Sequence, residues 1–199
     1  MSKISKIADQ AGNSGFVRPI QLKKAGLNSS DVARLISQGK LVRLERGLYR
    51  DADRQTSEHD NLAIVAVKYP RAVFCLLTAL RIHDLTTQSP HEIWIAIDVK
   101  ARPPSITYPP LRIVRFSGEA LKEGNSPKSI DGSVQIIVTG IEKTIVDCFK
   151  FRNKIGLDIA LEALHQAWQE KRINMDELWR LAQICRMHNI MRPYLESLI

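Results

Sequence analysis

The order of turn signals and apolar repeats in residues 16–50 constrains the fold more than any other feature of the chain. Gly26 and the polar run at 28–30 separate two short segments with helical spacing, and Gly39 ends the second of them. Glycine readily adopts the left-handed conformation that closes a helix, while Asn or Ser caps the start of the next one. The pattern therefore predicts two short helices joined by a tight turn, the second spanning about 30–38.

This second helix is predicted to have one apolar face and one polar face. The apolar face carries Val32, Leu35 and Ile36, with Ala33 at its edge. Such a face packs against a core. The opposite face carries side chains suited to DNA base edges, because Arg pairs with guanine, Gln with adenine and Ser with either base. The candidate base-reading residues are Ser30, Arg34, Ser37 and Gln38.

A β-hairpin is predicted directly after this helix. Residues 41–44 alternate as a strand does, residues 45–47 form a turn, and residues 48–50 form the returning strand. Two helices joined by a turn and followed by a hairpin make a winged helix-turn-helix. In such a domain the second helix enters the major groove, and the wing reaches phosphates or the minor groove. The candidate backbone-contacting residues are Arg18, Lys40, Arg43, Arg46 and Arg50.

The distribution of charge favours DNA as the partner of this module. Residues 1–54 hold eleven Lys and Arg against five Asp and Glu, a net charge of +6 out of +8 for the whole chain. A general basic background would be spread in proportion to length, so the excess marks an electrostatic footprint for nucleic acid. The alternative for the same turn pattern is a small helical domain with a solvated polar face and an ordinary hairpin.

The rest of the chain predicts an α+β fold. A polar linker near 51–57 leads to helices predicted at 58–69 and 73–83, and a first helix is also expected at the N-terminus with Ile4, Ile7, Ala8 and Ala11 on its inner face. Further predicted segments are a strand at 93–97, a proline-rich loop at 100–110, a strand at 111–116, a loop at 118–132 with a helical turn at 119–123, a strand at 134–138, and helices at 142–152, 156–171, 176–187 and 191–198. Strands followed by helices are typical of α+β domains. We therefore predict a winged helix-turn-helix domain at 1–54 and a mixed α+β domain at 55–199 that ends in a helical C-terminal region.

No pattern in the sequence indicates a catalytic centre, a metal site or a cofactor, so we expect a protein that is not an enzyme. Cys75, Cys148 and Cys185 are far apart in apolar surroundings, which predicts reduced core residues. A disulfide or zinc site is the alternative for them. Asp98 and Lys100 weakly suggest a nuclease, although that chemistry needs a second metal-binding acid.

The sequence also carries no signal for a membrane. No stretch approaches the roughly 20 apolar residues that span a bilayer, and the N-terminus has no long apolar region typical of a signal peptide. We therefore expect a cytoplasmic protein.

Three segments, in the same order, resemble the AbiEi family of antitoxins from type IV toxin–antitoxin and phage-defence systems. They are the helix-to-wing junction at 39–49, the stretch at 73–87 continued by 90–97, and the segment at 142–150. The resemblance implies a repressor that binds repeats in its own promoter. It also implies an antitoxin that counters a nucleotidyltransferase-like toxin without forming a stable complex with it.

A second function stays open at this point. The chain would then be a winged-helix transcriptional regulator whose C-terminal domain binds a ligand or a protein, with no antitoxin role. In both cases two copies are expected on DNA, because helix-turn-helix proteins usually read paired half-sites.

Overall fold

The computed structural model describes residues 15–53, 57–130 and 134–198. These residues form two compact units. The N-terminal unit comprises the described residues up to Pro70 together with 105–109 and 129–136, and the C-terminal unit comprises the remainder. The predicted helix at the N-terminus lies outside the described residues. The domain boundary predicted after residue 54 stays a prediction.

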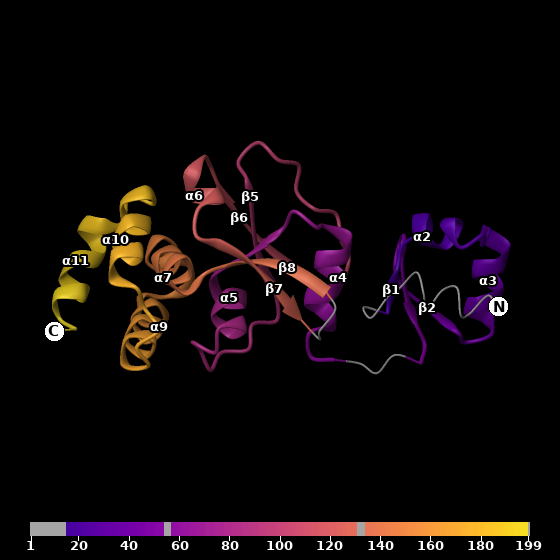
Figure 1. Cartoon of the computed structure of the whole chain (residues 1–199), viewed down its shortest axis with the longest axis horizontal. Helices are drawn as coiled ribbons and strands as arrows, with labels where there is room; N and C mark the ends of the chain where they lie inside the picture. The colour runs from indigo at the N-terminus through magenta and orange to yellow at the C-terminus, as the bar shows by residue number, and fades with distance from the viewer. Residues whose placement is uncertain (1–14, 54–56, 131–133, 199) are drawn as a thin grey trace. The chain divides into compact units, whose positions relative to one another are not determined.

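The N-terminal unit contains the predicted helix-turn-helix and hairpin (Figure 1). Its first elements are strand β1 (Phe16–Val17), helices α2 (Pro19–Lys24) and α3 (Ser29–Ser37), and strands β2 (Leu41–Glu45) and β3 (Leu48–Asp51). The three strands form an antiparallel sheet in the order β1-β3-β2. The winged helix-turn-helix is thus confirmed as a fold. Strand β1 was not predicted, because two residues are too short to show alternation.

Both helices of this module end in the same left-handed glycine motif. Gly26 has φ +78° and Gly39 has φ +67°. After α2 the Leu27 N–H donates to the Leu22 carbonyl at 3.0 Å, and after α3 the Lys40 N–H donates to the Leu35 carbonyl at 3.0 Å. In each bond the donor lies five positions after the acceptor, which is the Schellman motif. This motif satisfies carbonyl groups that the end of a helix leaves unpaired. The positions of both turns therefore follow from single residues.

Asn28 caps the start of α3, whereas the polar run at 28–30 left the cap open between Asn28 and Ser29. Its side-chain oxygen accepts from the Asp31 N–H at 2.9 Å, and the Asp31 carboxylate accepts from the Asn28 N–H at 3.3 Å. The reciprocal pair satisfies two donors at the helix start. The prediction for the apolar face of α3 needs a correction, because Leu35 is buried whereas Ala33 is exposed and Ile36 is 36% exposed. This short helix contacts the core through only one row of side chains, which contains Val32 and Leu35.

The N-terminal unit continues into helix α4 (Asp60–Lys68), close to the predicted 58–69. Its buried residues are Ala63, Ile64, Val65 and Ala66.

The second sheet has five strands in the order β6-β5-β4-β8-β7. They are β4 (Val73–Phe74), β5 (Ile93–Asp98), β6 (Leu111–Phe116), β7 (Asn125–Ile130) and β8 (Val134–Thr139). Strands β5 and β6 are parallel, as are β4 and β8, while β4 and β5 are antiparallel. Two predictions were wrong here. Val73–Phe74 is a strand rather than a helix start, so helix α5 spans only Leu76–Ile82, and β7 occupies a segment predicted as loop. Strand β7 contains Pro127 and lies at the sheet edge, where proline is tolerated.

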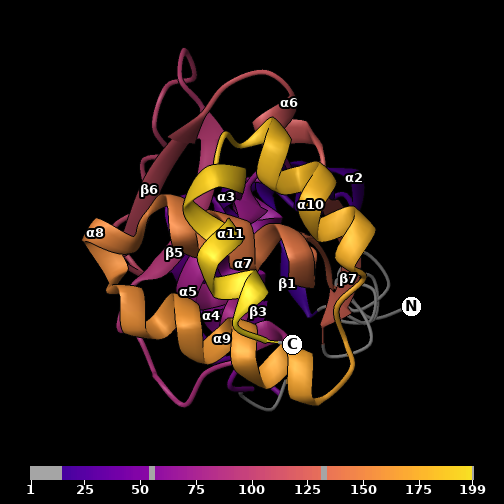
Figure 2. The same ribbon diagram turned by 90° about the vertical axis from the view of Figure 1, so that its left-hand side faces the viewer.

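The C-terminal region is helical, as predicted, and confirms the mixed α+β fold class. Its helices are α7 (Ile141–Lys150), α8 (Arg152–Ile155), α9 (Leu157–Gln169), α10 (Met175–Ile184) and α11 (His188–Glu196), and the short helix α6 (Glu119–Lys122) lies earlier, between β6 and β7. Figure 2 shows α10 and α11, in yellow, in front of α7. The predicted inward residues of α7, Ile145, Val146 and Phe149, are fully buried.

An ion pair lies inside this core. Lys143 and Asp147 are one turn apart on α7 and are 1% and 0% exposed, with the Lys143 Nζ 2.5 Å from both carboxylate oxygens. Nζ also lies 4.5 Å from the ring centroid of Phe116. Burial raises the pKa of the Asp147 carboxyl, against the opposing effect of Lys143. Each charge is therefore kept in the core by its partner. All three cysteines are buried and unpaired, as predicted.

Replacing one member of this pair is expected to destabilise the protein far more than replacing both. Asp147→Ala should lower the free energy of unfolding by about 3–5 kcal/mol, because it leaves a buried ammonium without a partner. The double variant Lys143→Met/Asp147→Leu removes both charges and should lose less than either single variant. Urea unfolding followed by circular dichroism compares the wild type, Asp147→Ala, Lys143→Met and the double variant. Additive losses would show that the two charges are independent.

Candidate nucleic-acid interface

The four candidate base-reading residues are brought together on one helix. Ser30, Arg34 and Ser37 are spaced along α3, and Gln38 is its C-cap residue. All four are exposed. Spacings of three and four residues place side chains on the same side of a helix. The face consequently presents one cation and three neutral hydrogen-bonding groups to solvent.

The Arg34 side chain is oriented by an acid on its own helix. Its Nη2 donates to the Asp31 Oδ1 at 2.9 Å, and the side chain of Arg34 is 57% exposed while that of Asp31 is 12% exposed. The carboxylate that completes the cap of α3 thus also holds one edge of the guanidinium. The Ser37 hydroxyl donates to the Arg34 carbonyl at 2.8 Å. Its oxygen therefore offers a hydrogen-bond acceptor to a ligand.

The cations of the wing and its approach differ in how they are presented. Lys40, Arg43 and Arg46 are exposed, and Arg18 is half-buried just before α2. Arg50 is held inside the protein instead: its Nη1 lies 3.3 Å from the Asp60 Oδ2 of α4, and its side chain is 17% exposed. The prediction grouped Arg50 with the phosphate contacts, but its charge is already matched by an acid. We leave it out of the proposed contact set.

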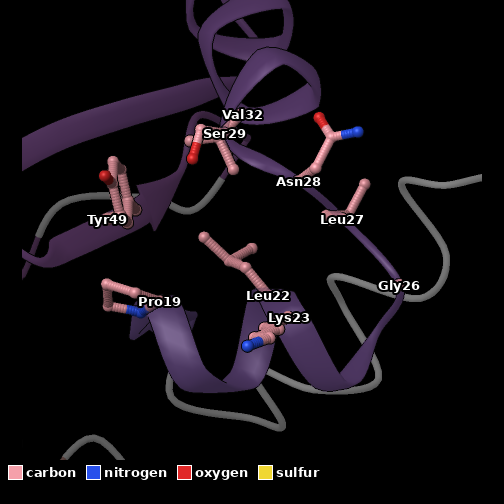
Figure 3. Close-up of a pocket in the computed structure, with 9 residues that line it drawn as sticks. All are labelled: Pro19, Leu22, Lys23, Gly26, Leu27, Asn28, Ser29, Val32 and Tyr49. Carbon is pink, nitrogen blue, oxygen red and sulfur yellow. The ribbon is translucent and has the colours of Figure 1, made fainter.

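A hollow that the sequence analysis did not predict lies beside the helix-turn-helix (Figure 3). Its volume is about 550 Å³. Leu22 of α2 projects into it between Tyr49 and Leu27, and Lys23 and Asn28 supply polar groups (Figure 3). The lining residues are Pro19, Leu22, Lys23, Gly26, Leu27, Asn28, Ser29, Val32 and Tyr49. They come from two helices, the turn and a strand, so no single segment of sequence carries a signal for it.

The residues that suggested a nuclease are not assembled into a metal site. The Asp98 carboxylate accepts from the Lys100 backbone N–H at 2.8 Å, a local turn at the end of β5. Glu92 precedes β5 and pairs with Arg112 at 3.2 Å. Glu92 and Asp98 are six positions apart along an extended strand, a separation of about 20 Å, which is too far for the two acids to share a metal ion. Among the described residues, no three His, Cys, Asp or Glu side chains gather as metal ligands.

The helices also bear on the expectation about membranes. Within the described ranges, none of them combines the length and the apolar character needed to cross a bilayer.

Comparison with known proteins finds a family model that is similar to the N-terminal module. A family model described as "Transcriptional regulator, AbiEi antitoxin" matches residues 6–50. No curated protein matches the chain. Among solved structures, the crystal structure of the RV2827C protein from Mycobacterium tuberculosis is similar, with a TM-score of 0.63 and 15% identity over 91% of this chain and 71% of that one. At this identity the likeness concerns the fold alone.

The family match includes α2, α3, the wing and the residues before them, and it ends at Arg50. The resemblances at 73–87, 90–97 and 142–150 lie beyond it and stay predictions. Over residues 6–50 the resemblance predicted from the sequence is confirmed, because the family model of AbiEi antitoxin transcriptional regulators matches this module.

Proposed function

We propose that this protein is a DNA-binding transcriptional autorepressor that also acts as the antitoxin of a type IV toxin–antitoxin system. The observation that carries the proposal is the exposed polar face of α3 beside the exposed wing cations, in a module matched by a family of regulators. The protein itself is not an enzyme in this proposal. Its operator is an inverted repeat in its own promoter, read by two copies of the predicted domain 1–54.

Helix α3 supplies sequence readout. Arg carries five N–H donors in a planar fork, and the bond to Asp31 occupies only one edge of that fork. The remaining donors match the O6 and N7 acceptors of guanine in the major groove. Gln38 offers a bidentate contact to adenine. Ser30 accepts from or donates to either base, and Ser37 accepts, because its own hydrogen is donated to the Arg34 carbonyl. The pattern suits a short half-site with at least one guanine.

The wing supplies affinity that does not depend on sequence. Lys40, Arg43 and Arg46 are exposed on the segment that follows α3. When Lys or Arg side chains neutralise DNA phosphates, the counterions condensed at those phosphates are released. The predicted domain carries a net charge of +6, so this contribution falls as salt rises.

The antitoxin role rests on the family. The partner would be a nucleotidyltransferase-like toxin in the cytoplasm, countered without a stable complex. The match ends at Arg50, and this favours a second candidate: a winged-helix regulator whose C-terminal unit binds a ligand or protein and has no antitoxin role. Rescue of cells from the product of a neighbouring nucleotidyltransferase gene separates the two.

The first experiment is a footprint of the purified protein on its own upstream DNA at two salt concentrations. A protected inverted repeat that resists moderate salt supports a site-specific autorepressor. Weak and uniform protection that disappears with salt would contradict the proposed readout by α3.

Arg34→Ala is expected to weaken operator binding by about 1–3 kcal/mol and to relax specificity at one base pair, because it removes a bidentate base contact. Arg34→Lys is the matched control, since it keeps the charge but cannot form the planar fork. Competition with operators changed at each position measures both. The assignment of Arg34 to base readout fails if Arg34→Lys discriminates bases as well as the wild type does.

Arg46→Ala is expected to weaken binding to all sequences alike and to lower the slope of log K against log salt by about one, because one phosphate contact is lost. Lys122→Ala removes an exposed cation from α6 in the C-terminal unit and serves as the control. Fluorescence titrations at several salt concentrations give the slopes. Equal slopes for Arg46→Ala and wild type would remove Arg46 from the interface.

A further inference from the structure

Glu45, the last residue of β2, carries three hydrogen bonds on a nearly buried carboxylate. Lys68 Nζ lies 2.6 Å from Oε2, and the side chain of Glu45 is 8% exposed. The Arg46 N–H donates to Oε2 at 3.0 Å, and the Thr107 N–H donates to Oε1 at 2.7 Å. All these residues belong to the N-terminal unit. One carboxylate therefore joins the wing turn to α4 and to the 105–109 segment.

The carboxylate is stably ionised. Hydrogen bonding from Lys68 and from the Thr107 backbone amide lowers the pKa of Glu45 to about 2. An acid at the tip of a wing would repel DNA phosphates if it were exposed. Here Lys68 matches its charge, and the side chain points away from solvent.

A second ion pair holds the other strand of the hairpin to the same helix. Arg50 of β3 pairs with Asp60 at 3.3 Å, with side chains 17% and 16% exposed. Asp60 is the first residue of α4 and Lys68 is the last, so the two pairs lie about 12 Å apart along the helix axis. An acid at the start and a base at the end also suit the helix dipole. The hairpin is thus attached at both ends of α4.

We infer that Glu45 is a positioning residue for DNA binding: it fastens the wing turn to α4 and the Thr107 segment, and so holds the neighbouring Arg46 where it meets a phosphate. This inference rests on the proposed DNA-binding function. Glu45 itself does not touch DNA. Its side chain acts through the backbone of the turn that carries Arg46.

Whether DNA binding tightens or weakens when Glu45 is neutralised distinguishes a positioning role from a purely electrostatic one. If Glu45 acted only as a negative charge near DNA, its neutralisation would tighten binding. If it positions the wing, neutralisation weakens binding although a repulsive charge has been removed. Glu45→Gln keeps the shape and an acceptor oxygen but loses the ion pair, so it tests the direction cleanly.

The test measures binding of full-length variants to the protein's own upstream DNA. Glu45→Gln and Lys68→Met should each weaken binding about twofold to tenfold, the change expected when one immobilised side chain is released. In the Arg46→Ala background, Glu45→Gln should have no further effect, because the two residues act as a unit. Glu58→Gln is the matched control: it removes an acid whose side chain is 74% exposed, so binding should stay equal or tighten slightly. Tighter binding by Glu45→Gln, or its full effect without Arg46, would overturn the inference.

A measurement without DNA keeps this inference separate from the proposed function. In Glu45→Ala the Thr107 amide loses its acceptor, so its hydrogen exchange should accelerate. The Leu27 amide, which donates to the Leu22 carbonyl at 3.0 Å in the same unit, should keep its wild-type rate and so report that this unit is folded. An unchanged Thr107 rate would overturn the attachment itself. Absence of DNA binding by the wild type would instead overturn the proposed function, whatever the exchange rates are.

Discussion

The left-handed backbone at Gly26 and Gly39 is the constraint on which the candidate interface depends. At both positions an added Cβ would meet no atom within 4 Å, so glycine is required by its φ angle and not by lack of space. The first turn sets the direction in which α3 leaves α2, and the second sets the direction in which the wing leaves α3. Because each turn is completed by two backbone hydrogen bonds, the glycines fix where α3 begins after α2 and where the wing begins after α3.

Features determined by neighbouring residues were therefore predictable from the sequence. The glycine turns, the Asn28 cap and the hairpin all depend on contacts within a few residues, and all were predicted near their observed positions. The short strands β1 and β4 and the polar strand β7 were missed, because they exist through pairing with distant segments. The exposure of Ile36 was missed for a related reason: a helical wheel shows which residues share a face, but not how much of that face a neighbour covers.

The candidate site shows the same division among its charged residues. The sequence does not distinguish Arg46 from Arg50, because both are arginines of the hairpin. In the structure, however, Arg46 is exposed and Arg50 is paired with an acid on α4. Glu45 reads in the sequence as an ordinary turn residue, while its partners Lys68 and Thr107 lie 23 and 62 positions away. Periodicity and charge counts locate a basic module. They do not say which of its cations are already matched, since that depends on helix α4 and the 105–109 segment.

The same difference, between features set by neighbouring residues and features set by distant contacts, explains why the two units compare differently with known proteins. Residues 6–50 match a family model, and the module they form is specified by glycines, caps and turn residues at fixed spacings that a sequence comparison can detect. The C-terminal unit depends instead on a core that many apolar sequences can fill, together with the buried Lys143–Asp147 pair. A similar fold over 91% of the chain at 15% identity is what such a core permits. Fold likeness in that unit does not carry a function with it, because function depends on particular surface residues. Its role must therefore be established on the C-terminal unit itself, independently of DNA binding by the wing and α3.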